Sequence, residues 1–339
     1  MSDIREAFAQ VMAGRSLSEA EAVNVFGEIF DGHAPDALVA GFLVALRIKG
    51  ESAAELAGAA RAMLKRARPL DLGPGLLDTA GTGGDNAGTV NISTGAALIA
   101  ATAGVRVAKH GNRAVSGRIG AADLLERLGV KIDLDPAGLR RCLDRAGICF
   151  VFAPAYHPVM ARLATLRREL GIRTLFNLLG PLANPARPSR QLLGVADPQL
   201  IRPMAEALAA LGVEHAMVVH GEDGLDEISC VAPTRVAEIR AGKIDYFQIE
   251  PERFGIARLP RASLATTGPE HAVEVLRRAL AGESGAAQDV LALNAGAAIY
   301  LGGAATSLET GVVRARAILV KGQALETLER MRRASQEES

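Results

Sequence analysis

The 339-residue sequence predicts an α/β fold, in which a small all-helical domain precedes a large domain with a mainly parallel sheet flanked by helices. Two observations predict this organisation. Residues 1–70 carry helix signals and contain no strand-like segment. From about residue 76, short apolar runs such as VRVA, CFVFAP and AMVVHG alternate with helical stretches such as AADLLERLG and IRPMAEALAALG. This alternation is typical of parallel strands covered by helices.

Start and stop signals indicate at least three helices before residue 70. The segment SEAEAVNVFGEIFDG ends at Gly32, and PDALVAGFLVALRIKG runs from Pro35 to Gly50. Proline near the first turn and glycine after the last one are common helix boundaries. Ser52 and Glu55 stand at the spacing of a capping box and open the next helix.

The composition argues against several classes of partner. Lys plus Arg and Asp plus Glu number 38 each, so the formal net charge is zero. This balance disfavours nucleic acid or an anionic membrane as a general partner. No apolar run reaches the roughly 18 residues of a membrane span, and the N-terminus does not resemble a signal peptide. The three cysteines show no C-x-x-C spacing, so we expect reduced thiols in a cytoplasmic protein.

A glycine-rich loop, GTGGDNAGTVNIST (81–94), follows the apolar run LLD and precedes the helix-like ISTGAALIAATAG. A strand, a glycine loop and a helix in this order direct backbone N–H groups at an anion. The loop is not a Walker A motif, because Thr89 stands where that motif has lysine. It is not the dinucleotide fingerprint either, because Asn86 stands in place of the last glycine or alanine. A tight turn without a ligand remains the alternative.

A second cluster, KHGNRAVSGRIG (109–120), follows the strand-like VRVA, so Lys109 is expected at a strand's carboxyl end. Lys109, Arg113 and Arg118 alternate with glycines there. Alone, the segment could be a solvated basic loop. Because ligands bind at the carboxyl ends of strands in open α/β sheets, the two clusters together favour a double phosphate site.

The acidic segment GEDGLDE (221–227) follows the strand-like AMVVH. Its four carboxylates, from Glu222, Asp223, Asp226 and Glu227, suit a hard cation such as Mg²⁺, although acidic loops are often merely solvated.

Two further features carry weaker signals. A segment with three arginines, RRELGIRTLFNLLGPLANP (167–185), could be a helix surface followed by a turn. Three histidines, His110, His157 and His220, show no ligand spacing and are interpreted as structural.

Six motifs together resemble the anthranilate phosphoribosyltransferase family, and they occur in that family's order: GTGGD (81–85), NIST (91–94), KHGNR (109–113), RRELGIRT (167–174), NLLGPLANP (177–185) and HGEDGLDE (220–227). The similarity extends to DVLALNAGAAIYL near residue 301. The resemblance implies a fold of the nucleoside phosphorylase and phosphoribosyltransferase type. Residues 1–70, joined by about 165–190, would form the helical domain, and residues 71–164 and 191–339 the α/β domain. It also implies a cleft between the domains and a homodimer formed through the helical domain.

The implied reaction transfers the phosphoribosyl group of 5-phosphoribosyl 1-pyrophosphate (PRPP) to the amine of anthranilate and releases pyrophosphate, a step of tryptophan biosynthesis. Since an aromatic amine is already nucleophilic, alignment and charge neutralisation would provide the catalysis, and no general base is evident. The resemblance assigns catalysis to Lys109, Asn112 and Arg167, and anthranilate binding to Gly81, Asn112 and Arg167. It implies Mg²⁺, two ions with PRPP, held by Ser93, Asp226 and Glu227.

The resemblance assigns PRPP binding to a longer set: Gly81, Gly84, Asp85, Thr89, Asn91, Ile92, Ser93, Thr94, Lys109, His110, Gly111, Asn112, Arg113, Ala114, Val115, Ser116, Gly117 and Ala121. Three positions depart from the family's usual residues, namely Asn86, Gly117 and Ala121. The last two lack a hydroxyl that could contact a phosphate, which bears on the strength of PRPP binding.

Two alternative functions remain at this point. A nucleoside phosphorylase shares the fold and the GTGGD motif, but KHGNR and Arg167 argue against it. A relative that binds nucleic acid would need a basic surface, which the balanced charge does not provide.

Overall fold

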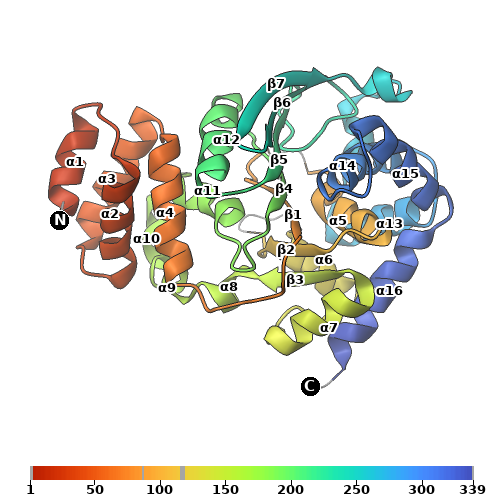
Figure 1. Ribbon diagram of the computed structural model, residues 1–339, viewed down its shortest axis with the longest axis horizontal. Coiled ribbons are helices and arrows are strands. Elements are labelled where there is room, and N and C mark those ends of the chain that lie inside the picture. Colours follow the sequence, from red (N-terminus) through yellow and green to blue (C-terminus); the bar gives the residue numbers. More distant parts are fainter. Residues whose placement is uncertain (1–2, 86–87, 115–118, 338–339) are drawn as a thin grey trace.

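The computed structural model describes residues 3–85, 88–114 and 119–337. The chain begins with four helices, which form the lobe at the left of Figure 1: α1 (Ile4–Met12), α2 (Glu19–Asp31), α3 (Asp36–Lys49) and α4 (Ala53–Lys65). The boundaries expected from the sequence are confirmed. Gly32 ends α2 with a φ of 74°, and Ser52 and Glu55 form the capping box of α4.

The second lobe is built around one seven-stranded sheet: β1 (Leu77–Gly81), β2 (Val107–Gly111), β3 (Ile148–Phe152), β4 (Arg190–Gly194), β5 (His215–Gly221), β6 (Thr234–Arg240) and β7 (Lys243–Ile249). The order is β3-β2-β1-β4-β5-β6-β7. The first five strands in this order are parallel, and β6 and β7 are antiparallel additions at one edge. The mainly parallel sheet is therefore confirmed.

Two strands extend further than the apolar runs indicated. β1 does not end with the run LLD but continues through Thr79 and Ala80 to Gly81, paired in register with Gly194 of β4. β2 includes Lys109 and ends at Gly111. Both strands therefore include polar residues. The backbone groups of these residues are hydrogen-bonded to neighbouring strands, and this pairing does not depend on the type of side chain.

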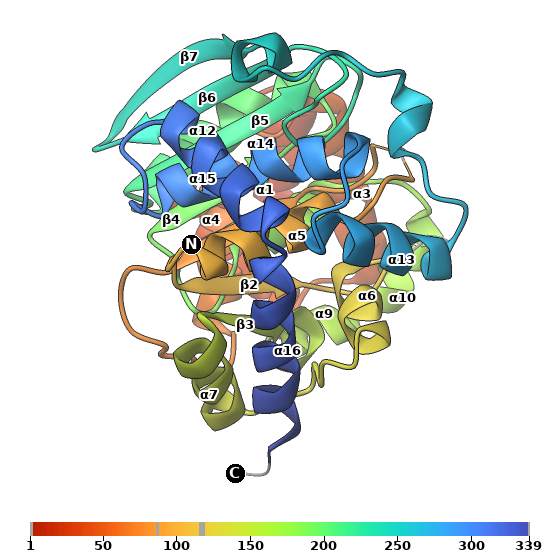
Figure 2. The same ribbon diagram turned by 90° about the vertical axis from the view of Figure 1, so that its right-hand side faces the viewer.

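Eight helices flank the sheet (Figures 1 and 2): α5 (Ile92–Thr102), α6 (Ala121–Arg127), α7 (Pro136–Ala146), α12 (Ile201–Ala210), α13 (Pro269–Leu280), α14 (Ala286–Leu301), α15 (Leu308–Val320) and α16 (Gln323–Gln336). Alternate residues of the strands face opposite layers, as the pleat requires. Leu192 of β4 packs in a core with α5 and α14, whereas its neighbour Leu193 packs in a core with α12 and the N-terminal helices. The sheet thus shares one of its cores with the helical lobe.

Four short helices follow β3 and turn toward the helical lobe: α8 (Ala153–Tyr156), α9 (Pro158–Arg162), α10 (Ala164–Leu170) and α11 (Leu175–Leu182). Phe176 of α11 contacts Phe26 and Phe30 of α2, with ring centroids 6.2 and 6.0 Å apart. Short 3₁₀ turns lie at Pro198–Leu200, Pro251–Phe254 and Arg261–Leu264.

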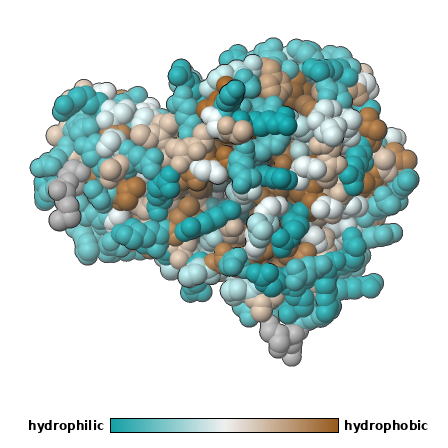
Figure 3. Space-filling view, viewed as in Figure 1, coloured by the Kyte–Doolittle hydropathy of each residue, from teal (hydrophilic) through white to brown (hydrophobic). Residues whose placement is uncertain are grey.

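Hydrophilic residues cover most of the face seen in Figure 3, with hydrophobic residues in scattered small groups. Among the described residues, no helix has the length and apolar character needed to cross a membrane.

Candidate active site

A cavity of about 930 Å³ opens at the carboxyl ends of β1 and β2. From β1 the chain runs to β2 and β3 on one side, and β4 and β5 lie on the other. The sheet order therefore reverses at β1, which is where open α/β sheets leave a crevice for ligands. We call the wall formed by residues 80–85, 88–93, 109–114, 119–121 and 226–227 the strand side. The wall formed by residues 153–181 is the helical side.

The glycine loop forms the floor of the strand side. Gly83, Gly84 and Gly88 have φ values of 66°, 89° and 61°, which favour glycine. After the loop, Asn91 caps α5 by accepting a hydrogen bond from the Thr94 amide at 3.2 Å. The N-terminus of α5 therefore points into the cavity with the partial positive charge of a helix start. The structure fits the expected anion site at this place.

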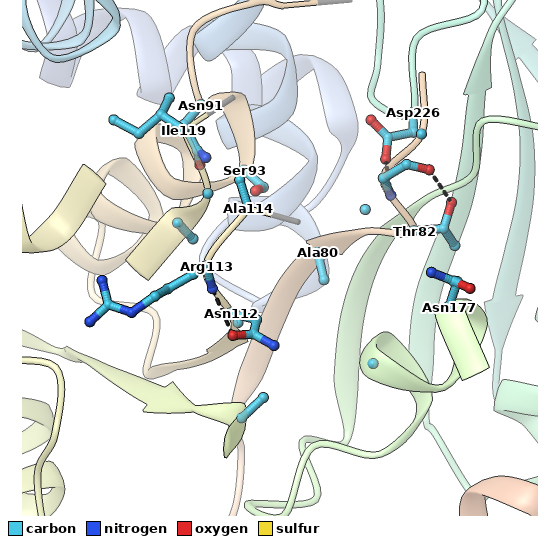
Figure 4. A pocket seen from close by; sticks show the side chains of 18 of the residues that line it. Ala80, Thr82, Asn91, Ser93, Asn112, Arg113, Ala114, Ile119, Asn177 and Asp226 are labelled. Atoms are coloured by element: carbon cyan, nitrogen blue, oxygen red, sulfur yellow. Dashed lines mark hydrogen bonds between the residues drawn. The ribbon is translucent and has the colours of Figure 1, made fainter. Parts of the chain in front are cut away.

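Two glycines allow the acidic loop to lie directly on the ends of β1 and β4. A Cβ on Gly81 would stand 2.3 Å from Oδ2 of Asp226, and one on Gly194 would stand 1.5 Å from the Asp226 carbonyl oxygen. The Asp226 carboxylate also accepts a hydrogen bond from the Gly83 amide at 2.7 Å (Figure 4). Close backbone approach thus explains why glycine occurs in both strands.

Asp226 and Glu227 form a buried acidic pair, with 8% and 7% of their surface exposed. Burial is the main cause that raises the pKa of Asp226 to about 7. Burial and the neighbouring Asp226 also raise the pKa of Glu227 well above its usual value. Two carboxylates that repel each other in a poorly solvated wall are an electrostatic site for a cation.

Of the four carboxylates in the acidic segment, Asp226 and Glu227 line the cavity and the other two do not. Glu222 forms an ion pair with Arg235 at 2.5 Å instead, and Asp223 is absent from the described cavity wall. Within the described ranges, no three His, Cys, Asp or Glu side chains gather into a metal site. Ser93, Asp226 and Glu227 supply hard oxygen donors that fit Mg²⁺ when a substrate contributes further oxygens.

Lys109 is buried in β2, with 2% of its surface exposed. Its Nζ donates to the Thr79 carbonyl oxygen and, at 3.0 Å, to Oγ of Ser93. Burial lowers the pKa of Lys109, while nearby Asp78 and Glu227 raise it. The ammonium group therefore ties β1, β2 and the start of α5 together and orients the Ser93 hydroxyl.

Asp78 is a buried residue of β1 that fixes the neighbouring strand β2 through hydrogen bonds. It accepts hydrogen bonds from the His110 amide at 3.1 Å and from Nδ2 of Asn184 at 2.9 Å. Burial raises the pKa of the Asp78 carboxyl, and the charge of Lys109 lowers it. The backbone that leads from β2 into the cavity is thus fixed by a buried polar network.

The helical side carries a guanidinium that has no ionic partner among the described residues. Arg167 of α10 lines the cavity, and no carboxylate of the described chain pairs with it. Burial lowers the pKa of its guanidinium, although arginine stays charged at any physiological pH. Its neighbour Arg168 is exposed and donates to Thr165 at 3.4 Å. A partly desolvated, unpaired guanidinium favours an anionic ligand on this wall.

Two histidines also line the cavity, with ring centroids 5.2 Å apart. Nδ1 of His110 contacts the Gly180 carbonyl oxygen at 2.9 Å, whereas both ring nitrogens of His157 are buried without a hydrogen-bond partner in the described part of the chain. Burial lowers the pKa of His110 to about 4 and that of His157 to about 3. Both rings are therefore neutral near pH 7. Of the three histidines interpreted as structural, only His220 lies away from the cavity, and its Nδ1 contacts the Val195 carbonyl oxygen.

The cavity brings together nearly all described residues singled out from the sequence. On the strand side these are Gly81, Gly84, Asp85, Thr89, Asn91, Ile92, Ser93, Lys109, His110, Gly111, Asn112, Arg113, Ala114, Ala121, Asp226 and Glu227, and Arg167 lies opposite. Among the described residues that the resemblance assigns to the site, Thr94 is the exception, because it is fully buried and does not line the cavity. Val115, Ser116 and Gly117, with Asn86 and Arg118, lie outside the described residues.

Arg113 lines the cavity, but its guanidinium is not directed into it. Its guanidinium pairs with Glu126 and with Asp123, and Figure 4 shows it pointing away from Thr82 and Asp226. The expected role of Arg113 as a phosphate-binding cation is therefore not supported in this conformation, because two carboxylates already neutralise it.

The structure adds residues that the sequence does not single out. Arg173 and Asn177 line the cavity from the helical side, Thr82 lines it from the glycine loop, and Thr266 lines it from the segment before α13. In the sequence, Arg173 is only one of three arginines in its segment. Thr174 and Asn177 have the spacing of a capping box, which is a sequence signal for a helix start. This signal places Arg173 in the turn immediately before α11.

Comparisons with known proteins agree with this geometry. Residues 5–67 match the model of the glycosyl transferase family helical bundle domain, and residues 73–325 match that of the glycosyl transferase family a/b domain. The chain is 49% identical over 333 residues to an anthranilate phosphoribosyltransferase of Rubrobacter xylanophilus, covering 98% of this chain and 97% of the relative.

Solved structures give the same result. The anthranilate phosphoribosyltransferase of Thermus thermophilus superposes with a TM-score of 0.91 at 45% identity, covering 98% of this chain and 99% of that one. The Saccharomyces cerevisiae enzyme, at 27% identity, gives 0.87 for its complex with PRPP and Mg and 0.85 for that with 4-fluoroanthranilate; each covers 98% of this chain and 97% of that one.

Proposed function

The chain belongs to the anthranilate phosphoribosyltransferase family, and from this premise we propose that it transfers the phosphoribosyl group of PRPP to the amine of anthranilate. The products are N-(5-phosphoribosyl)anthranilate and pyrophosphate. One observation carries the proposal. A single cavity joins a glycine loop and a buried acidic pair on the strand side to an unpaired guanidinium on the helical side. These walls fit a pyrophosphate and an aromatic carboxylate, respectively.

The strand side would bind PRPP. The amides of the glycine loop and of the first turn of α5 are hydrogen-bond donors for its pyrophosphate. Lys109 keeps the Ser93 hydroxyl oriented. Ser93, Asp226 and Glu227 would hold Mg²⁺, which supplies positive charge to the departing pyrophosphate. That PRPP and Mg are bound by the yeast enzyme supports magnesium use, while the presence of two ions stays a prediction.

The helical side would bind anthranilate. Arg167 offers a planar fork of donors to the substrate carboxylate and so orients the ring. Asn112 and the Gly81 backbone lie on the facing wall and would direct the amine toward C1 of the ribose. The amine attacks C1 while the bond to pyrophosphate breaks, and the amine then loses a proton. Positioning of the two reactants accounts for much of such a rate increase.

Several assignments beyond the reaction remain our proposals. We propose that residues 1–70 and about 165–190 form one helical domain, because Phe176 of α11 packs on Phe26 and Phe30. A homodimer formed through this domain and a cytoplasmic location are also proposed, the latter because all three cysteines are free. Neither a nucleoside phosphorylase nor a nucleic-acid-binding protein is supported by the named relatives.

A fluorescence assay tests the proposed function. The purified chain with anthranilate, PRPP and Mg²⁺ should consume the anthranilate fluorescence, and omission of PRPP or addition of a chelator should stop the reaction. Phosphate-dependent cleavage of thymidine should be absent in the same preparation. If thymidine were cleaved and anthranilate were not consumed, the phosphorylase alternative would replace this assignment.

A further inference from the structure

The glycine loop has one peptide group that is held from both ends. The Thr82 carbonyl oxygen accepts a hydrogen bond from Nη2 of Arg173 at 2.8 Å. The amide of the same peptide, on Gly83, donates to Oδ2 of Asp226 at 2.7 Å. Asp226 follows β5 on the strand side, whereas Arg173 lies between α10 and α11 on the helical side. Two distant segments therefore meet at one peptide plane.

The loop needs such contacts to adopt one conformation. Gly83 and Gly84 both have positive φ, and glycine has little intrinsic preference for one region of backbone space. The preceding residue is already fixed, because the Thr82 amide donates to the Gly194 carbonyl oxygen at 2.9 Å. At the far end, the Gly88 carbonyl oxygen accepts from Thr266. Between these two fixed positions, the Thr82–Gly83 peptide accepts a hydrogen bond from a side chain of the helical side, that of Arg173.

Arg173 also lies directly against Gly84 of the loop. A Cβ on Gly84 would stand 2.3 Å from Nη1 and 2.7 Å from Cζ of Arg173. Only glycine leaves room for the guanidinium there. Although Arg173 as a whole is exposed, its guanidinium therefore sits on the loop and shares the field of Asp226 and Asp85. Arg167, in contrast, has no partner on the described part of this loop.

We propose that Arg173 is a positioning residue for PRPP: it fixes the Thr82–Gly83 peptide and thereby sets the direction of the loop amides that receive the pyrophosphate. The inference rests on the proposed function, since it names how one wall of that site is ordered. The backbone of Arg173 is continuous with α11, which packs on α2 and α4. The contact thus couples the position of the helical side to the shape of the phosphate site.

The test compares Arg173→Ala, Arg173→Lys and, as a matched control, Arg168→Ala in the full-length enzyme. In Arg173→Ala we expect KM for PRPP to rise about tenfold to a hundredfold, as for a lost hydrogen bond from a charged group. KM for anthranilate should change by less than about twofold. Arg173→Lys keeps a charged donor and should recover part of the loss, and Arg168→Ala should match the wild type. Unchanged circular dichroism and Tm would exclude a folding defect.

Hydrogen–deuterium exchange of peptides spanning residues 77–92 adds a reading that is independent of catalysis. In the ligand-free Arg173→Ala variant the loop amides should exchange faster than in the wild type, because an anchor is lost. Unchanged exchange with a raised KM would mean that Arg173 binds PRPP directly, and the positioning role would be wrong. An unchanged KM for PRPP would also overturn it. If the wild type did not consume anthranilate, the proposed function would fail, while exchange would still report on the anchor.

Discussion

On the strand side of the cavity, the polar groups come from β2, from the start of α5 and from the loops that follow β1, β2 and β5. On the helical side, they come from α8–α11, which have eight residues or fewer each, and from the turn before α11. The strand side contains charges of both signs that influence one another, since Asp78 and Glu227 both raise the pKa of Lys109. The helical side contains the unpaired Arg167 and the neutral His157, whose ring centroid lies 5.2 Å from that of His110 on the strand side. The mixed charges of the strand side suit the binding of a metal ion together with a phosphate. The unpaired guanidinium of Arg167 on the helical side suits the binding of a carboxylate.

The largest expected effect comes from removing the acidic pair of the strand side. Asp226→Asn combined with Glu227→Gln should lower turnover by about a thousandfold or more, since charge stabilisation by a metal is worth several kcal/mol. The fold should remain intact or gain stability in metal-free buffer at pH 8, because two mutually repelling buried carboxylates become neutral. Steady-state rates and thermal unfolding measure the two effects.

A control variant from the same loop sharpens this test. Glu222→Gln removes a carboxylate that faces Arg235 at the surface and should leave the rate near that of the wild type. Near-normal turnover of the double variant at limiting Mg²⁺ would show that the strand side does not hold the metal.

The second effect separates the helical side from the strand side. Arg167→Ala should cost roughly 2–5 kcal/mol in kcat/KM for anthranilate, the range for breaking a buried pair of charges. Affinity for PRPP, measured by calorimetry with Mg²⁺, should change little. Arg168→Ala should have a small effect on both quantities, because its side chain is exposed. If the two variants behaved alike, or if PRPP binding weakened most, the anthranilate wall would be placed wrongly.

The two walls also differ in how well the sequence predicts them. On the strand side, motifs follow apolar runs, and parallel strands bring their carboxyl ends to one edge. The glycine loop, the KHGNR segment and the acidic segment can therefore be expected at one site, whereas the metal-binding roles of Ser93, Asp226 and Glu227 come from the family resemblance. The sequence does not reveal the direction of individual side chains. Whether Arg113 faces the ligand or Glu126 depends on its rotamer. Thr94 is buried because it lies on the inward-facing side of α5.

On the helical side, α8, α9 and α10 begin without a side-chain cap, and His157 ends α8 and begins α9. Such short segments carry no periodicity from which a facing direction can be read. For this reason the sequence suggests only a structural role for His157 and gives no sign of the contact between Arg173 and Thr82. Arg167, which lines the cavity, is expected there only because its motif resembles that of a known family.

The third effect concerns the neutral histidines. A histidine whose pKa is lowered on folding binds fewer protons in the folded state, so it costs stability as pH falls below its unfolded pKa of about 6.5. The folded pKa of His157 is about 3, so this cost is still growing at pH 5. There it amounts to about 2 kcal/mol, from about 1.5 pKa units at roughly 1.36 kcal/mol each.

His157→Phe tests this sign. The variant should lose about 2 kcal/mol less than the wild type between about pH 7.5 and pH 5.0, measured by denaturant unfolding at both values. Because the other titrating groups are common to both proteins, the difference isolates this ring. An equal loss in both proteins would mean that His157 is solvated, and the helical side would be more polar than described.

The smallest expected effect returns to the strand side, where Ala121 stands in place of a frequent serine. Ala121 is the first residue of α6, half-buried and on the cavity wall. Ala121→Ser adds a hydroxyl at a helix N-terminus that faces the expected phosphate, and one neutral hydrogen bond contributes about 0.5–1.5 kcal/mol. KM for PRPP should therefore fall by roughly twofold to tenfold, with KM for anthranilate unchanged.

Ala122→Ser is the contrasting variant. Because Ala122 is fully buried, the serine hydroxyl introduced there should lower Tm without tightening the binding of PRPP. If Ala121→Ser left KM for PRPP unchanged, the start of α6 would lie outside the phosphate site, and that site would be confined to the glycine loop and the end of β2.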